Sequence, residues 1–431
     1  MTSEIREPSR TELPDYYRAL PFANGLPSWE PAPAAWHGGP EPWPPMRTPA
    51  TPKQLEQWAE LDDADASYHP VAAFVGGKVV GASAMLSMEV TNPGGAFLPT
   101  AGVTGTGVIA THRRRGLLRQ MMQAMVHSAL ERRETFAMLS ASEGSIYGRF
   151  GFHVSTHRAR WEIARADAQL RPTQADSGSL ELVDASTARE HWPTVHATVR
   201  ATRVGELSPQ PGRWDSLTDA ASGTDGPLRY LVHRNADGHV DGAANFRLPW
   251  SSSLEHVGTL VIEALEATTP QAYRAMWGLL LDFDLTSTIV APGRPRDEPL
   301  RWMLGNPRAM RITRQSDNLW ARILDVKQVL EARSYDCPDT VTFTIDDDTM
   351  CPANNGTWRL AVEGSDGECS RTDKAADLSI DLAGLSALYL GGMSAHDLAY
   401  AGRIRPHVDD ALQRVSRMLR SDPEPYNSFG F

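Results

Sequence analysis

Residues 101–119 read AGVTGTGVIATHRRRGLLR. Residues 101–108 combine β-branched side chains with glycine, which indicates a buried strand that packs closely against its neighbours. Three arginines and Gly116 follow, and the chain then continues with the apolar spacing of an amphipathic helix. The apolar stripe consists of Leu117, Leu118, Met121, Met122, Met125 and Leu130. The stretch therefore predicts a strand, a basic loop and a helix in direct succession.

The arginine loop has the chemistry of a pyrophosphate site. Backbone N–H groups are exposed at a helix N-terminus, and the helix dipole adds partial positive charge there. Gly116 lets the chain come close to a ligand, and the guanidinium groups of Arg113–Arg115 can contact phosphate oxygens. A P-loop is excluded because no Gly-Lys-Ser/Thr follows, and the G-x-G-x-x-G spacing of a Rossmann site is absent.

The composition limits the possible partners. A chain of 431 residues with 41% hydrophobic side chains is expected to form two or three packed domains. Its formal net charge of −11 argues against a general nucleic-acid or anionic-membrane binder and leaves room for cationic substrates. Cys337, Cys351 and Cys369 match neither a disulfide framework nor a zinc pattern. We therefore expect reduced thiols, no metal site and a cytoplasmic location.

Two segments near the N-terminus are informative. Residues 1–15 are charged and lack the apolar core of a signal peptide, and no stretch of the chain reaches the roughly 18 apolar residues of a membrane span. Residues 21–52 are rich in proline and predict a long irregular loop or lid, with a poorly ordered linker as the alternative. Trp29, Trp36 and Trp43 in this segment favour burial or substrate contact.

Strand and helix patterns alternate along the rest of the chain. Residues 71–95 predict a hairpin with a Gly-Gly turn, residues 135–142 a short buried strand, and residues 155–163 a further strand. The same alternation returns between 228 and 292, with a helix at 269–284 that is capped by Thr269 and has Pro270 in its first turn. No Arg/Gly loop accompanies this second helix, so the architecture is repeated without a phosphate site. A third unit opens at residues 316–335, with further strands at 340–346, 356–364 and 376–382 and helices at 382–392 and 409–422.

The arginine loop resembles the acyl-CoA loop of the GNAT N-acetyltransferases, whose signature is Arg/Gln-x-x-Gly-x-Gly/Ala. Arg113 and Gly116 fit this signature, whereas Leu118 stands where the family usually has glycine or alanine. The Eis (enhanced intracellular survival) acetyltransferases tolerate that leucine. The chain resembles them in the blocks FLPTAGV, THRRRGLLRQMM, SASEGSIYGRFGF, LWARILDVKQVLEARSY and LSALYLGG, and in its terminal Phe. The resemblance covers about residues 70–431, and the segment 21–52 departs from it.

The resemblance implies acetyl-CoA as the cosubstrate and assigns residues to it. The strand residues Thr106, Gly107 and Val108 would pair with the pantetheine amides. Backbone amides of the loop would hold the pyrophosphate, and Ser142 and Glu143, at the next strand end, would border the same cofactor. The residues assigned to the loop are Arg114, Arg115, Gly116, Leu117, Leu118 and Arg119.

The resemblance also implies two catalytic groups. Tyr147 would be the general acid that protonates the departing CoA thiolate, and the α-carboxylate of Phe431 would be the general base for the amine. A tyrosine in a glycine-rich turn is more often a packed aromatic residue, and a chain terminus is normally solvated and frayed. The tail YNSFGF, however, places Tyr426, Phe429 and Phe431 in the last six residues, and burial of these rings would draw the terminus inward.

The fold that the resemblance implies is α+β, with tandem GNAT domains followed by a domain similar to sterol carrier proteins. We expect an N-terminal GNAT domain at 1–175, a second GNAT-like domain without cofactor at 176–320, and the sterol-carrier-like domain with the catalytic terminus at 321–431. The expected function is acetyl transfer to a primary amine of an aminoglycoside-like molecule or of lysine, in a homo-hexamer. The alternatives are a non-catalytic CoA-binding regulator and a lipid-binding carrier.

Overall fold

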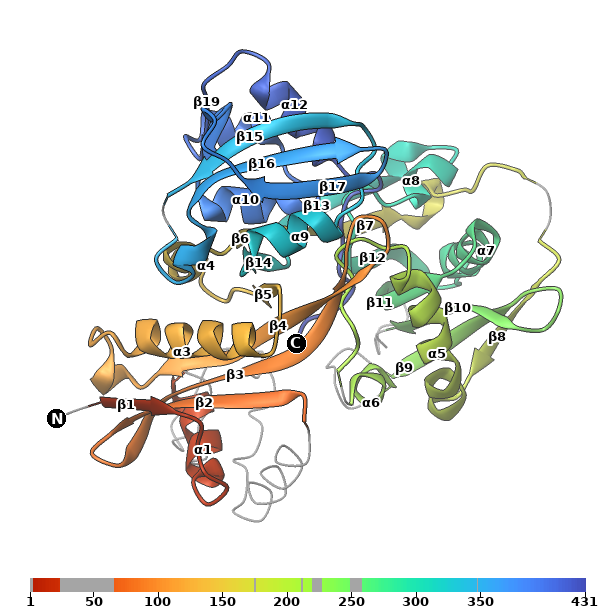
Figure 1. The fold of residues 1–431 in the computed structure, drawn as a ribbon. Helices are drawn as coiled ribbons and strands as arrows, with labels where there is room; N and C mark the ends of the chain where they lie inside the picture. The colour runs from red at the N-terminus through yellow and green to blue at the C-terminus, as the bar shows by residue number, and fades with distance from the viewer. Residues whose placement is uncertain are drawn as a thin grey trace.

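The computed structural model describes residues 3–23, 66–173, 176–210, 212–218, 227–248, 258–346 and 348–431. These residues form three β-sheets with helices packed on them, which confirms the predicted α+β class (Figure 1). Most of the proline- and tryptophan-rich segment 21–52 lies outside the described residues, with Trp29, Trp36 and Trp43. Its first residues were expected in the irregular loop, but residues 21–23 complete helix α1 (Leu13–Ala23).

The first sheet has the strand order β1-β2-β3-β4-β5-β14-β6. Its strands are β1 (Ser3–Arg6), β2 (Tyr68–Val75), β3 (Lys78–Thr91), β4 (Phe97–Val108), β5 (Phe136–Leu139), β6 (His153–Val154) and β14 (Trp320–Ile323). Gly76 and Gly77 adopt φ values of 59° and 74° between β2 and β3, so the predicted Gly-Gly hairpin turn is confirmed. The helical turns η1 (Ala110–His112), α4 (Gly144–Tyr147) and η2 (Gly148–Phe150) lie in its connections.

Helix α3 (Leu117–Glu131) follows the arginine loop and covers one face of the first sheet. Its buried residues are Leu117, Met121, Met122, Met125, Val126 and Ala129. The burial of each large apolar side chain contributes about 1.5–3 kcal/mol to stability. Leu118 is partly buried, but the sequence was wrong about Leu130, which is 38% exposed because Ala129 occupies the buried position of that turn.

The second sheet has the order β13-β7-β12-β11-β10-β9-β8. Its strands are β7 (His157–Ala164), β8 (Ser179–Val183), β9 (Leu228–Arg234), β10 (Val240–Arg247), β11 (Gly258–Ala267), β12 (Thr286–Arg294) and β13 (Met310–Asp317). Its helices are α5 (Ala185–Arg200), α6 (Arg213–Thr218), α7 (Pro270–Leu281) and α8 (Leu300–Met303), with the helical turns η3 (Arg165–Asp167) and η5 (Pro307–Ala309). The predicted cap of α7 is confirmed: Thr269 Oγ1 accepts a 3.1 Å hydrogen bond from the Ala272 N–H, and Pro270 opens the helix.

The third sheet has the order β17-β16-β15-β18-β19. Its strands are β15 (Asp339–Ile345), β16 (Gly356–Glu363), β17 (Asp366–Arg371), β18 (Leu378–Ile380) and β19 (Ile404–Pro406). Its helices are α9 (Val326–Ala332), α10 (Leu382–Tyr389), α11 (Ala395–Tyr400) and α12 (Ala411–Met418), with the helical turn η6 (Pro352–Asn354). Helix α10 of this unit packs on β14 and β6 of the first sheet (Figure 1).

Alternate side chains of the first sheet enter two different cores. Met85 and Ala137 pack with α3, whereas Leu86 and Met138 pack with residues of α9, α10 and β15. This is the period of two expected when both faces of a strand are buried. The first sheet is therefore fixed between α3 and the C-terminal unit.

The sheets exchange strands along the chain. β14 was expected to open the C-terminal unit, but it pairs with β5 and β6 in the first sheet. β7, which follows β6 directly, belongs to the second sheet. The sheets are thus not separate chain segments, and the boundaries at residues 175 and 320 stay a prediction. No helix of the described residues is both long and apolar enough to cross a membrane.

Candidate active site

Strands β4 and β5 separate after a short parallel pairing. The pairing joins Thr100–Gly102 of β4 to Phe136–Met138 of β5, whereas β4 continues to Val108. On its other edge β4 remains paired with β3 as far as Val108. Within the described part of the chain, the outer edge of β4 beyond Gly102 therefore has no strand partner, and an extended ligand with amide groups can pair with it. Thr106, Gly107 and Val108 lie on this part of β4.

The arginine loop leads from β4 into α3 with its backbone exposed. Gly116 is the N-cap residue of α3 with φ 80°, and it supplies no side-chain hydrogen bond to the first N–H groups of the helix. A Cβ on Gly116 would meet Gln120 Nε2 at 3.7 Å as its nearest contact, so the space beside the glycine is open. An uncapped helix N-terminus with open space beside it suits a phosphate group.

Two arginines of this loop form hydrogen bonds with nearby backbone carbonyls, and the other side chains differ in their exposure. Arg113 Nε donates to the Val108 carbonyl at 3.1 Å, and Arg115 Nη2 donates to the Thr111 carbonyl at 3.2 Å. These bonds hold the loop against the end of β4. Arg114, Arg115 and Arg119 are exposed, Leu118 is partly buried and Leu117 is buried in the core under α3. Leu117 could therefore contribute to a ligand site only through its backbone.

Ser142 and Glu143 lie in the loop after β5, which ends at Leu139. Both residues are exposed, and Glu143 immediately precedes α4. Ser142 lines a cleft between this loop and the second sheet. The structure thus places them beyond β5, at the opposite side of the strand separation from the arginine loop.

Tyr147 ends helix α4 and lies close to β4. Its side chain is buried and contacts Phe152 edge to face, with ring centroids 6.1 Å apart. Burial raises the pKa of the phenol, a hydrogen bond with Thr106 opposes this rise, and the charge of Glu143 adds to it. Thr106 Oγ1 also lies 2.6 Å from Ser83 Oγ of β3. The phenol is therefore protonated at neutral pH and held beside the free edge of β4.

The C-terminal tail is anchored between the three sheets. The rings of Tyr426 and Phe429 are buried, and Phe431 is partly buried, so the expectation that the tail is drawn inward is confirmed. The Tyr426 N–H donates to the Val204 carbonyl at 2.9 Å. Asn427 is buried, and its carbonyl accepts a 2.7 Å hydrogen bond from Asn318 Nδ2.

A buried acid cluster beside the second sheet, formed by Glu206, Glu266 and His196, holds the tail at Ser428. Ser428 donates to Glu206 Oε1 through its N–H at 3.0 Å and through its Oγ at 2.8 Å. The same Oγ lies 3.4 Å from Glu266 Oε1, and Glu266 accepts a 2.9 Å hydrogen bond from His196 Nδ1. Arg213 lies 4.6 Å above the ring of Phe429. The sequence analysis missed this cluster, because no local motif relates residues that are 222 positions apart.

The ionisation of this cluster follows from its burial. Desolvation raises the pKa of Glu206, and the neighbouring charge of Glu266 adds to the rise. For Glu266, desolvation is the largest single effect and raises the pKa. The hydrogen bonds from His196 and Trp192 and the charges of His196 and Arg203 together outweigh it, so the net pKa is lowered. Desolvation lowers the pKa of His196, but the hydrogen bond to Glu266 and the negative charges of Glu266 and Glu206 together outweigh it, so the net pKa is raised. His196 and Glu266 therefore form a buried ion pair beside the tail.

The second unit contains a strand separation of the same kind, but this one is closed. β11 and β12 pair in parallel over Gly258–Val261 of β11, and β11 then continues to Ala267. Arg294 of β12 donates from Nη1 to the Leu265 carbonyl of β11 at 2.6 Å, across this separation. Arg294 is also paired with the buried Glu298. These contacts occupy the place that a cofactor would need between β11 and β12.

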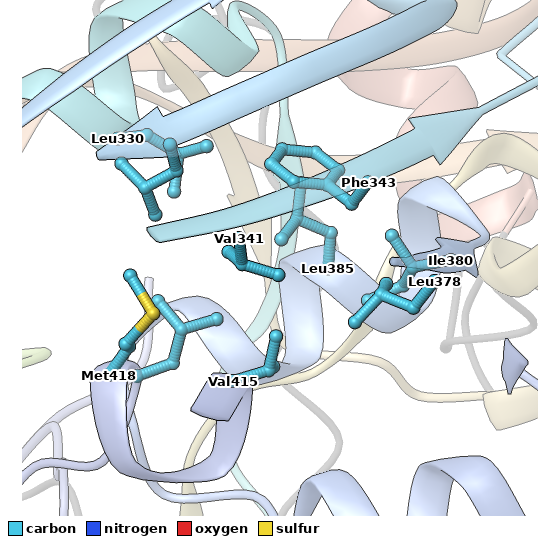
Figure 2. A pocket seen from close by; sticks show the side chains of 10 residues that line it. Leu330, Val341, Phe343, Leu378, Ile380, Leu385, Val415 and Met418 are labelled. Atoms are coloured by element: carbon cyan, nitrogen blue, oxygen red, sulfur yellow. The ribbon is translucent and has the colours of Figure 1, made fainter. Parts of the chain in front are cut away.

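The third unit encloses a small apolar cavity (Figure 2). Leu330, Val341, Phe343, Leu385, Val415 and Met418 are among the side chains that point into it. Its volume is about 20 Å³, which is room for about one water molecule. Pockets that bind organic ligands are commonly about 300–1,000 Å³. The cavity is therefore too small for a lipid in this conformation.

The described residues contain no group of three or more His, Cys, Asp or Glu side chains that could hold a metal ion. Cys337, Cys351 and Cys369 form no disulfide in the described part of the chain.

Comparison with known proteins identifies the parts of the chain. Residues 46–155 and 205–323 each match the acetyltransferase (GNAT) domain, and residues 326–428 match the sterol carrier protein domain. The chain is 36% identical to an uncharacterized N-acetyltransferase of Streptomyces avermitilis over 88% of this chain and 92% of that protein. It is 32% identical to the N-acetyltransferase Eis of Mycobacterium bovis over 83% and 87% of the two chains. The crystal structure of Eis1 from Mycobacterium abscessus superposes with a TM-score of 0.83 at 28% identity, over 99% of this chain and all of that one.

Proposed function

The chain belongs to the Eis family of GNAT N-acetyltransferases, and we propose that it transfers the acetyl group of acetyl-CoA directly to a primary amine. By family resemblance, the acceptor is an aminoglycoside-like molecule or a lysine side chain. The cofactor would pair with the free edge of β4 at Thr106–Val108, and its pyrophosphate would lie at the arginine loop.

One observation carries this proposal: the side chain of the proposed acid and the ring of the residue that bears the proposed base both lie against β4, near where it leaves β5. Tyr147 reaches the strand at Thr106, and the ring of Phe431 lies against Gly102. Gly102, Thr106 and Val108 all belong to β4. The proposed acid, the residue of the proposed base and the proposed cofactor position therefore lie along one strand.

In the proposed reaction the amine nitrogen attacks the thioester carbonyl, a C–N bond forms and the C–S bond breaks. The α-carboxylate of Phe431 accepts the proton that the amine loses, directly or through a water molecule. Tyr147 donates its proton to the departing thiolate, and its raised pKa keeps that proton available until the thiolate develops. The acid cluster at Ser428 holds the tail, and with it the terminal carboxylate, in position.

The two alternatives make different demands on the structure. A lipid carrier needs a large apolar cavity, and the cavity in the third unit is about 20 Å³. A non-catalytic CoA-binding regulator would have no use for a buried phenol and a partly buried chain terminus against the same strand. Both features favour the enzyme.

An amine-panel assay tests the proposal. The purified protein is incubated with acetyl-CoA and single amines, free CoA is measured, and products are identified by mass spectrometry. We expect amine-dependent release of CoA and a mass gain of one acetyl group per site. Binding of acetyl-CoA without turnover of any amine would instead identify a regulator.

The assembly and the location are further parts of the proposal. We propose a homo-hexamer in the cytoplasm, in keeping with the family resemblance and the free cysteines. Analytical ultracentrifugation gives the oligomeric state, and a single species of another size would refute the hexamer.

A further inference from the structure

A cleft of about 570 Å³ lies between the loop after β5 and the second sheet. Ser140 and Ser142 line it on one side, and Arg158, Arg160 and Arg314 line it on the other. This volume falls in the range of pockets that bind small organic ligands, about 300–1,000 Å³. The cleft is separate from the arginine loop and from the acid cluster of the tail.

Two of these arginines oppose each other directly. Arg314 of β13 is the cross-strand partner of Arg160 of β7. Like charges in this position repel each other and destabilise a sheet. Within the described residues, neither guanidinium group forms a hydrogen bond or an ion pair with the protein. The third arginine, Arg158, donates only to the neutral Ser316 Oγ, at 3.4 Å.

The acidic groups nearby offset only part of this charge. Asp317 is the one carboxylate among the residues that line the cleft, and it accepts a hydrogen bond from Trp320 Nε1 at 2.5 Å, so one negative charge faces three arginines. Glu162, on the same strand as Arg160, is paired with Arg311. The three arginines are all exposed to solvent at the cleft. Their charge is available to an anion from outside the protein.

The cleft lies next to the proposed reaction site. Ser142 borders it on the side of β5, and Ser142 is a proposed cofactor neighbour. On the opposite side Asn318 lines the cleft and holds the tail through the Asn427 carbonyl at 2.7 Å. Gly293 also lines it, and its carbonyl accepts the Tyr426 hydroxyl. A molecule in the cleft would therefore have the proposed cofactor on one side and the segment that carries the proposed base on the other.

We propose that this cleft binds an anionic group, a phosphate or a carboxylate, of the amine acceptor. Arg160 and Arg314 are the specificity-determining residues, with Arg158 as a third donor. This inference rests on the proposed acetyl transfer and, of the two acceptor classes proposed above, favours lysine-like amines that also carry an anionic group over aminoglycoside-like polycations. A polycationic amine would be repelled by the same three guanidinium groups.

Binding of inorganic phosphate tests the cleft without any turnover. Phosphate is titrated by calorimetry into the full chain, first alone and then with saturating CoA, which blocks the cofactor's own phosphate positions. We expect phosphate to bind in the presence of CoA, and the double variant Arg160→Gln/Arg314→Gln to weaken it at least about tenfold. Arg308→Gln is the control, because Arg308 is exposed, lies just before β13 in η5 and is not among the residues that line the cleft. It should leave phosphate binding unchanged.

Three results would overturn the inference. If both variants weaken phosphate binding equally, phosphate responds only to the overall electrostatic field of the protein and not to this cleft. Loss of phosphate binding when CoA is present would assign the cleft to a phosphate of the cofactor. A clear drop in melting temperature of the double variant would assign the two arginines a structural role, since removal of a like-charge pair should not destabilise the sheet.

A pair of amines tests the acceptor side. Nα-acetyl-lysine carries a carboxylate, and Nα-acetyl-lysinamide has the same amine without it. We expect kcat/KM to favour the acid at least about tenfold in the wild type and to be nearly equal in the double variant. No preference, or turnover of neither amine, contradicts the assignment to this acceptor class. Acetylation of other amines would still support the proposed enzyme, so the two failures can be told apart.

Discussion

The ring of Phe431, the terminal residue, lies against Gly102, the last residue of β4 that pairs with β5. A Cβ built on Gly102 would stand 3.0 Å from Cε2 and 3.3 Å from Cδ2 of that ring. It would also stand 2.7 Å from Met88 Sδ. A side chain at this position would therefore force Met88 and the ring of Phe431 to shift away from the strand.

Gly102→Ala should therefore displace the terminus. Because the ring of Phe431 must move, we expect kcat to fall at least about tenfold and stability to fall by about 1–3 kcal/mol from overpacking. Steady-state kinetics and urea unfolding measure both. Gly278→Ala in α7 is the control, since its new Cβ would meet Leu170 Cδ1 at an ordinary 3.6 Å. Unchanged kcat in Gly102→Ala would separate the position of Phe431 from catalysis.

Gly116→Val tests the proposed pyrophosphate site. A valine at φ 80° is strained and fills the space beside the helix N-terminus, so the KM for acetyl-CoA should rise at least about tenfold. Gly238→Val carries the same backbone strain at φ 82° and also has open space around it, but it lies in the turn between β9 and β10. The control should lose stability without a change in KM. If both variants leave KM unchanged, the pyrophosphate binds elsewhere.

Tyr147→Phe removes the proposed general acid and keeps the ring that packs on Phe152. Loss of a positioned acid costs on the order of 10²–10⁴ in rate, so kcat should fall by that factor while acetyl-CoA binding is retained. Tyr335→Phe is the matched control, because its buried hydroxyl donates to the Leu330 carbonyl at 2.7 Å in the third unit. A similar small loss in both variants would reduce Tyr147 to a packing residue.

The ion pair of His196 and Glu266 predicts a pH-dependent stability. A histidine pKa raised above 6.5 contributes stability that is complete below 6.5 and is lost as the pH rises through the folded-state value. The lowered pKa of Glu266 gives stability that is lost only as the pH falls through its folded-state value, below 4.5. His196→Gln should therefore lower the urea midpoint more at about pH 6 than at about pH 9. An equal loss at both values would mean that His196 is neutral in the folded protein.

The sequence could predict the elements that depend on local pattern. The strand before the arginines, the cap of α7 at Thr269 and the Gly76–Gly77 turn all rest on neighbouring residues. The exposure of Leu130 could not be read from the same pattern, because the sheet under α3 decides which side of the last turn is covered. A local pattern therefore predicts whether a segment is a helix or a strand, but not which of its side chains the rest of the fold covers.

Long-range pairings had no signal in the sequence. The insertion of β14 between β5 and β6 requires strands about 180 residues apart to meet, and period-two patterning gives no partner for a strand. The bond between Ser428 and Glu206 and the opposition of Arg160 and Arg314 arise in the same way, from the meeting of distant segments. The tail was the exception, because three aromatic rings in its last six residues already indicated burial.

The central claim is that the α-carboxylate of Phe431 is the general base. Comparing kcat of a chain extended at its C-terminus with kcat of a chain extended at its N-terminus tests this claim most directly. One residue added after Phe431 moves the terminal carboxylate by about 3.5 Å, beyond hydrogen-bonding reach of the amine. At saturating acetyl-CoA, we expect kcat of the C-terminally extended chain to fall on the order of 10²–10⁴ below that of a chain with the same residues added at the N-terminus, with acetyl-CoA affinity equal in both. Equal kcat values in the two chains would contradict the claim and leave the proton transfer to another group.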